Sequence, residues 1–306
     1  MLNFSSFLVT SFLVTLLSTP FVIKISHKTN LMDHPADDPL KIHRTPIPVL
    51  GGLGILSGII ISLLLGLTLF NNLLQNILGL MIALLILFII GLADDSRSLK
   101  PWTRILGQLF AALIVIFLSG FAINLIPHRL TNTIITIFYL LGAINAINLI
   151  DGIDGLATGI TLVASASFLI GFIFLENTLG IILSLSLIGV CSGFLLYNTH
   201  PAKIFLGDNG STLLGFLLGI LAVLFTSTPS SLEIFLFPLL VLIVPILDTS
   251  LAIYRRVKIH TPLSLGDRDH LYDKLIKKGL SQNQTTFLMC SFGIIGGLSG
   301  IYLITH

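Results

Sequence analysis

Hydrophobic segments of roughly 20 residues recur along the whole chain, and each is about as long as an α-helix that crosses the hydrocarbon core of a bilayer. The mean hydropathy is +1.02, and only 10% of the 306 residues are charged. Because a helix satisfies its own backbone hydrogen bonds, it is the form in which such segments cross a membrane. We therefore predict an all-α polytopic membrane protein in which residues 1–306 form a single integral-membrane domain. The ten predicted spans are 2–25, 49–70, 77–93, 105–126, 133–150, 156–175, 179–197, 211–226, 232–253 and 285–304.

The basic residues predict the orientation of these spans. When the ten spans alternate in direction, all of the sixteen Lys and Arg residues except Arg129 fall on one side of the membrane. By the positive-inside rule that side is cytoplasmic, so both termini are expected to be external. We expect a multi-pass protein of the cytoplasmic membrane with its active site on the cytoplasmic face and with no nucleic-acid partner.

The third span ends in two adjacent carboxylates, Asp94 and Asp95. Neighbouring carboxylates repel one another unless a cation or a proton lies between them. A solvated helix end is the plain alternative. Because the pair lies on the same side of the membrane as the other acidic loops, we favour a functional role.

Four polar residues follow one another at intervals of three near the end of the fifth span: Asn145, Asn148, Asp151 and Asp154. At this spacing residues of a helix stay near one face. Hydrogen bonding between membrane helices would explain one Asn, but hardly two Asn and two Asp together. We predict that this segment is part of a site.

A third acidic turn places Asp208 between Gly207 and Gly210. A carboxylate here is a suitable hard oxygen ligand for Mg²⁺, with Mn²⁺ as an alternative. Ser211 then opens a helix whose N-terminal amides would favour a nearby phosphate. Three acidic turns on one face of a membrane predict a shared site for a cation and phosphates.

The last polar loop, 254–284, contains Arg268 and His270. Arginine forms bidentate bonds to phosphate, which suits recognition of a pyrophosphate. Asp248 lies three residues after Pro245, and a broken helix at this proline would shape a groove. Asp248 pairing with a neighbouring cation is the other interpretation.

Five sequence blocks carry a family likeness. They are Lys41-Ile42-His43-Arg44-Thr45-Pro46-Ile47-Pro48 with Gly51-Gly52; Asp94-Asp95 with Leu99; Asn145 to Leu156; Asn198 with Pro201-Ala202-Lys203; and Phe205-Leu206-Gly207-Asp208 with Gly210-Ser211. In this order they resemble the polyprenyl-phosphate N-acetylhexosamine-1-phosphate transferases. That family includes undecaprenyl-phosphate GlcNAc-1-phosphate transferase and phospho-MurNAc-pentapeptide transferase.

The resemblance implies a reaction in which a sugar-1-phosphate moves from a UDP-N-acetylhexosamine to polyprenyl phosphate, with release of UMP and a requirement for Mg²⁺. It implies Asp208 as the metal ligand, Phe205 as the residue that stacks on uracil, and Asp154 near the nucleoside. Asn148, Asp151 and Asn198 would surround the metal and pyrophosphate, and Asp94 and Asp95 would position or activate the lipid phosphate. Lys41, Arg44, Asn145, Arg268 and His270 are further candidates for substrate binding.

The chain departs from the family in its last loop. Family members usually have two or three histidines there, whereas here the loop reads His270-Leu271-Tyr272-Asp273. This departure bears on sugar recognition, and it argues mildly against the MurNAc-pentapeptide reaction. We expect GlcNAc-1-phosphate to be transferred.

Two mechanisms and two other functions stay open at this point. The lipid phosphate attacks directly, or an aspartate first forms a phospho-enzyme. An ion-coupled transporter would place its carboxylates near the bilayer midplane, and an inactive scaffold would release no UMP. A homodimer is also compatible with the sequence.

Overall fold

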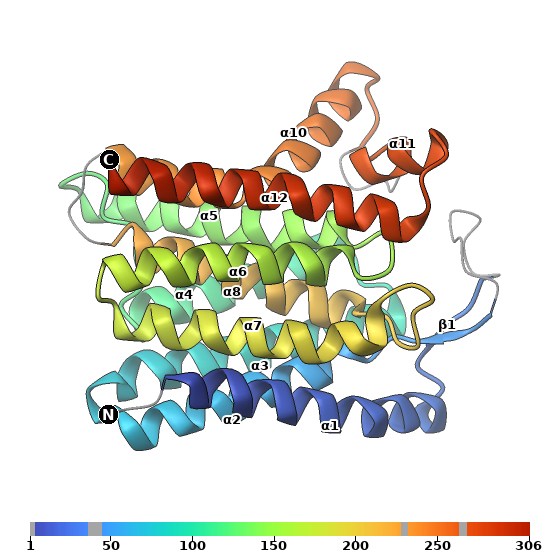
Figure 1. The fold of residues 1–306 in the computed structure, drawn as a ribbon, viewed down its shortest axis with the longest axis horizontal. Coiled ribbons are helices and arrows are strands. Elements are labelled where there is room, and N and C mark those ends of the chain that lie inside the picture. The colour runs from blue at the N-terminus through green and yellow to red at the C-terminus, as the bar shows by residue number, and fades with distance from the viewer. Residues whose placement is uncertain (1–3, 36–44, 228–231, 263–267) are drawn as a thin grey trace.

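The structure is a computed structural model that describes residues 4–35, 45–227, 232–262 and 268–306. It is a bundle of long helices that run side by side (Figure 1). The helices are α1 (Ser5–Thr29), α2 (Gly51–Leu69), α3 (Leu74–Arg97), α4 (Pro101–Phe117), α5 (Arg129–Ile150), α6 (Leu156–Phe174), α7 (Thr178–Asn198), α8 (Gly207–Phe225), α9 (Leu232–Val241), α10 (Ile243–Lys258), α11 (Leu271–Lys277) and α12 (Gln282–Thr305), with a short 3₁₀ helix, η1 (Asn71–Leu73). Strands β1 (Met32–Asp33) and β2 (Ile47–Pro48) pair antiparallel, with Met32 opposite Pro48. The prediction of an all-α polytopic membrane protein is confirmed.

Eight helices of the described chain are long and apolar enough to cross a membrane. The predicted span 105–126 is too long, because α4 ends at Phe117 with only 17 residues. The chain turns out of this helix at Gly120, whose φ is +73°, and the Phe121 amide closes back onto the Val115 carbonyl at 3.1 Å. A helix of this length is about 25 Å long, slightly less than the thickness of the hydrocarbon core.

The predicted span 232–253 is not one helix. It is broken at Leu242 into α9 and α10, which are bent by 75°. Pro245 explains the break, because it has no N–H with which to continue the ladder of the preceding helix, and proline is tolerated in the first turn of a new one. In Figure 1, α10 leaves the bundle instead of continuing along it.

Helix α8 forms the core of the bundle, and every residue from Asn209 to Phe225 is buried. It packs against α2, α3, α5 and α6. At the contact with α5, a methyl group on Gly215 would lie 2.7 Å from the Ile144 Cα atom, so only glycine allows these helices to approach so closely.

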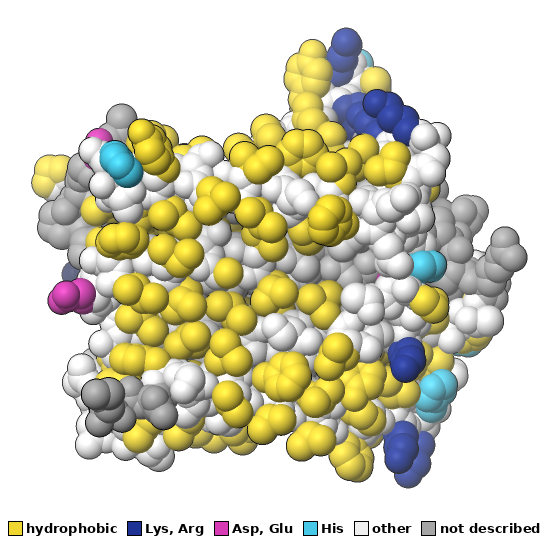
Figure 2. Space-filling model, in the orientation of Figure 1, with side chains coloured by type: hydrophobic (Ala, Val, Ile, Leu, Met, Phe, Trp, Pro, Cys, Tyr) yellow, Lys and Arg dark blue, Asp and Glu magenta, His cyan; other side chains and the backbone are white. Residues whose placement is uncertain are grey.

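The two ends of the bundle differ in character. Both termini lie at the left end in Figure 1, whereas the β1–β2 sheet and α11 lie at the right end. Figure 2 shows hydrophobic side chains over the middle of the visible face and Lys and Arg side chains toward the right end and on α10. Helix α7 begins at the left end in Figure 1, and Asn177 caps it, because its side chain accepts the Gly180 amide at 2.8 Å. On this face the Lys and Arg side chains therefore lie apart from the hydrophobic middle of the bundle.

Candidate active site

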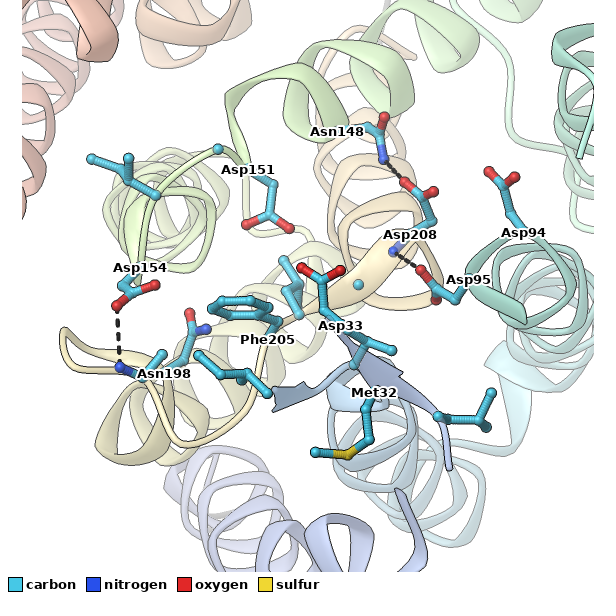
Figure 3. Close-up of a pocket in the computed structure, with 18 of the residues that line it drawn as sticks. Met32, Asp33, Asp94, Asp95, Asn148, Asp151, Asp154, Asn198, Phe205 and Asp208 are labelled. Carbon is cyan, nitrogen blue, oxygen red and sulfur yellow. Dashed lines mark hydrogen bonds between the residues drawn. The ribbon is translucent and has the colours of Figure 1, made fainter. Parts of the chain in front are cut away.

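A cavity of about 1050 Å³ opens at the end of the bundle that carries the basic residues. Its described lining comes from the β1–β2 region, the end of α3, the α5–α6 turn, the α7–α8 loop and the segment before α11 (Figure 3). The predicted site residues that line it are Asp94, Asp95, Asn148, Asp151, Asp154, Asn198, Phe205, Asp208 and Arg268. Residues from three separate acidic turns thus meet in one cavity, as the sequence predicted.

Four predicted residues lie elsewhere. Lys41 and Arg44 fall outside the described residues. Asn145 lines a small neighbouring pocket behind Asp208, where its side-chain amide donates to Gln108 Oε1 at 2.9 Å. His270 is 4% exposed and does not line the cavity.

The cavity is strongly acidic. Its described lining contains six aspartates, including the unpredicted Asp33, but Arg268 is the one arginine or lysine among these residues. An anionic pyrophosphate would be repelled by such a surface in the absence of a bound cation. Burial raises the pKa of the Asp151 carboxyl group well above its usual range, and the charges of Asp208, Asp95 and Asp154 raise it further.

Asp208 lies in the first turn of α8, and Asn148 of α5 holds its carboxylate. The Asn148 side-chain amide donates both to Asp208 Oδ1 and to Ser211 Oγ, the second bond at 2.9 Å. Arg104 Nη1 lies 3.7 Å from the other Asp208 oxygen. In Figure 3 the Asp208 carboxylate is directed at the Asn148 side chain, and Asp151 lies farther along the cavity, on the α5–α6 turn.

Both members of the Asp94-Asp95 pair accept hydrogen bonds from the protein. Asp94 accepts from Arg104 Nη1 and from the Leu99 amide, each at 2.7 Å. Asp95 accepts from the Asp208 amide at 2.8 Å and from the Asn209 amide at 3.0 Å. These carboxylates therefore bind the end of α3 to α4 and to α8.

Phe205 is held at its backbone and projects its ring into the cavity (Figure 3). Its amide donates to the Pro48 carbonyl at 2.8 Å, and its carbonyl accepts from the Gly51 amide at 3.1 Å. The end of β2 and the start of α2 thereby hold the backbone from which the ring projects. Asn198 also holds this loop, because its side chain donates to the Ile204 carbonyl at 3.0 Å and accepts from the Thr158 hydroxyl group.

Asp154 binds the α7–α8 loop at the other end of the cavity. Its Oδ2 atom accepts from the Ala202 amide at 3.1 Å and lies 2.6 Å from His200 Nδ1. His200 was not among the predicted site residues, although it precedes the Pro201-Ala202-Lys203 block and also lines the cavity. The position of His200 directly before that block could have marked it as a site residue.

Asp33 was missed because nothing in the sequence marks it. It lies in a polar loop without helical periodicity, and only the pairing of β1 with β2 brings it to the cavity. In Figure 3 its carboxylate lies next to Phe205 and points into the cavity.

His270 is part of the support for α11. Its Nδ1 atom lies 2.6 Å from Asp248 Oδ2, and the Leu271 amide donates to Asp248 Oδ1 at 2.7 Å. The pair is buried, and His270 is a side-chain partner of Asp248 in the described structure. The expected direct contact of His270 with substrate does not fit this placement, because the imidazole lies outside the cavity lining.

Arg268 and Tyr272 place this last segment against the α5–α6 turn. Arg268 Nη1 donates to the Gly152 carbonyl at 3.4 Å. The buried Tyr272 ring lies parallel to that of His270 and packs directly on Gly152. The segment therefore forms one wall of the cavity next to Asp151.

Among the described residues, no three His, Cys, Asp or Glu side chains are grouped closely enough to hold a metal ion on their own. Mg²⁺ sites that handle phosphates commonly use one or two carboxylates, with water and the substrate phosphates as the other ligands. The Asp208 and Asp151 carboxylates are oxygen donors of this kind. The acidic lining around them fits a divalent cation.

The chain is similar to known proteins along most of its length. The model of glycosyl transferase family 4 matches residues 77–226, which include four of the five polar blocks. The chain is 32% identical to the probable undecaprenyl-phosphate N-acetylglucosaminyl 1-phosphate transferase of Bacillus subtilis, over 96% of this chain and 83% of the relative. It is 29% identical to the decaprenyl-phosphate N-acetylglucosaminephosphotransferase of Mycolicibacterium smegmatis, over 92% and 77%. It is 31% identical to the phospho-N-acetylmuramoyl-pentapeptide-transferase of Lactobacillus gasseri, over 97% of each. The chain therefore belongs to glycosyl transferase family 4, among the polyprenyl-phosphate N-acetylhexosamine-1-phosphate transferases, and is a multi-pass membrane enzyme of that class.

Proposed function

We propose that this protein transfers GlcNAc-1-phosphate from UDP-GlcNAc to undecaprenyl phosphate and releases UMP. The reaction would be the first membrane step in the synthesis of a cell-envelope glycan. The observation that carries the proposal is the meeting of Asp151, Asp208 and Phe205 in one cavity at the end of a membrane bundle. The relatives' names support GlcNAc, since those from Bacillus subtilis and Mycolicibacterium smegmatis both name it.

The cofactor in this proposal is Mg²⁺, with Mn²⁺ as a substitute, held by Asp208 and Asp151. When bound, the cation would offset the charge of the pyrophosphate and of the UMP that leaves. The fit rests on the excess of carboxylates over cationic side chains in the described lining.

The other residues bind and orient the donor. The Phe205 ring stacks on uracil, with Asp154 near the nucleoside. Arg268, which contacts the α5–α6 turn, binds a phosphate. An oxygen of the lipid phosphate forms a bond to the sugar-linked phosphorus, and the bond from this phosphorus to UMP breaks. UMP keeps the electron pair. A phosphate monoester is already ionised near neutral pH, so its attack needs little help from a base.

We also propose that the cavity faces the cytoplasm, as the placement of the basic residues favours. The orientation can be tested in intact cells. Cys191 and Cys290 are first replaced by serine, and a single cysteine is then introduced at Lys100 or at Arg129. An impermeant thiol reagent should label the Arg129→Cys protein and leave the Lys100→Cys protein unlabelled until the membrane is opened. The reverse pattern would reject the proposed orientation.

The activity is tested with purified protein, undecaprenyl phosphate, Mg²⁺ and one UDP-sugar at a time. We expect UMP release and a GlcNAc-pyrophosphate lipid, identified by mass spectrometry, with UDP-GlcNAc. The same measurement with UDP-MurNAc-pentapeptide tests the second candidate reaction, which the Lactobacillus gasseri relative's name suggests. Product with neither donor, from protein that is folded in detergent, would contradict the proposed function.

A further inference from the structure

The geometry points to Asp95 as a positioning residue whose carboxylate holds the first turn of α8, and with it Asp208, at the edge of the cavity. The family resemblance had implied instead that Asp94 and Asp95 position or activate the lipid phosphate. The inference rests on the proposed function in one respect only, which is the role of Asp208 as a cation ligand.

Asp95 acts as a helix cap supplied by another helix. The first amides of α8 have no acceptor within their own helix, as at every helix N-terminus. The Asp208 amide donates to Asp95 Oδ1, and the Asn209 amide donates to Asp95 Oδ2. The Asn209 side chain donates to the same Oδ2 atom and also to the Val49 carbonyl, at 2.8 Å. Both oxygens of Asp95 are thus engaged by one turn of α8.

The backbones of α3 and α8 touch at the same place. Gly91 lies one turn before Asp95 and so faces the same way. A methyl group on Gly91 would come within 2.7 Å of the Asn209 nitrogen and 2.8 Å of the Asp208 carbonyl oxygen. The close packing at Gly91 brings the α8 terminus to the carboxylate that caps it.

This arrangement makes Asp95 unsuited to binding or deprotonating a substrate. A phosphate that displaced the α8 amides from Asp95 would leave two partly buried backbone donors without their acceptor. The loss of such partners costs more than an ordinary hydrogen bond contributes. Asp208 is then fixed twice, because Asp95 of α3 holds its backbone and Asn148 of α5 holds its carboxylate.

The test compares the purified wild-type protein with Asp95→Ala, Asp95→Asn and a matched control, Asn177→Ala. The control removes a helix cap at the opposite end of the bundle, where Asn177 accepts the Gly180 amide. Two measurements need no turnover: hydrogen–deuterium exchange of the peptide that covers residues 207–212, and the affinity for Mn²⁺ from its electron paramagnetic resonance signal.

We expect Asp95→Ala to speed exchange in the 207–212 peptide and to weaken Mn²⁺ binding, each by at least about tenfold, or about 1.4 kcal/mol in binding. Asp95→Asn keeps one acceptor oxygen, and asparagine is a good cap, so its values should lie between those of Asp95→Ala and the wild type. Asn177→Ala should change neither value. If Asp95→Ala cannot be purified in folded form, Asp95→Asn carries the comparison with the wild type.

The inference is wrong if exchange and Mn²⁺ affinity of the Asp95 variants match the wild type while kcat falls, since Asp95 would then act on the substrate. It is also wrong if Asp95→Asn is as impaired as Asp95→Ala in exchange. Failure of the proposed function is recognised separately: a wild-type protein that binds no Mn²⁺ would reject the cation site, and the exchange data would still decide the role of Asp95.

Discussion

Replacing Gly152 by alanine tests whether the last loop is packed on the α5–α6 turn. A methyl group on Gly152 would lie 2.7 Å from Tyr272 Cε2 and still closer to the phenol oxygen. Because Tyr272 is only 3% exposed, its ring cannot simply turn into solvent. Gly152 does not have a positive φ, so the backbone itself accepts alanine and only space is at issue.

Overpacking of this kind costs about 1–3 kcal/mol. If all of this cost falls on the active arrangement of the cavity wall, Gly152→Ala lowers kcat/KM by about 5- to 150-fold, since 1.36 kcal/mol corresponds to a factor of ten in rate. The smaller variant Tyr272→Leu makes room, so in its background Gly152→Ala should cost much less. The assay is UMP release at several UDP-GlcNAc concentrations for the four members of the double-mutant cycle. Equal losses in both backgrounds would refute the packing argument.

The remaining predictions concern the proposed reaction. Asp208→Asn should abolish UMP release while the protein stays folded by size-exclusion chromatography, and near-normal turnover would remove its role in cation binding. Phe205→Ala should weaken UDP-GlcNAc binding by about 1–3 kcal/mol, if a stacked base is lost, and Phe205→Tyr should retain the binding; an unchanged KM in Phe205→Ala would argue against stacking. Direct attack predicts no UMP from UDP-GlcNAc alone, and a burst equal to the enzyme concentration would establish a phospho-enzyme instead.

The sequence predicted most of the bundle because hydrophobic length is a local property. It also predicted that three acidic turns share one cavity, since each follows or precedes a span on the same side of the membrane. Where the chain departs from the predicted spans, the cause is local and small. The chain turns at Gly120, just after the early end of α4. Pro245 breaks the helix three residues before its own position, at Leu242.

The hydrogen-bond partners of the site residues could not be predicted in the same way, because they depend on which helices lie in contact. The residues around Asp95 and His270 do not reveal that one meets the amides of α8 and the other meets Asp248. Asp33 reaches the cavity through a strand pair of two residues on each side, which is too short to leave a pattern. In each case a pairing distant in sequence decides the role.

The burial of α8 has a mechanical consequence. From Asn209 to Phe225 this helix is enclosed by other helices, so lipid tails press on its neighbours and not on it. A bilayer that becomes thicker or thinner changes the tilt of the outer helices at modest cost. Asp208 lies in the first turn of the enclosed helix, so it should move less than residues on the outer helices in membranes of different lipid composition.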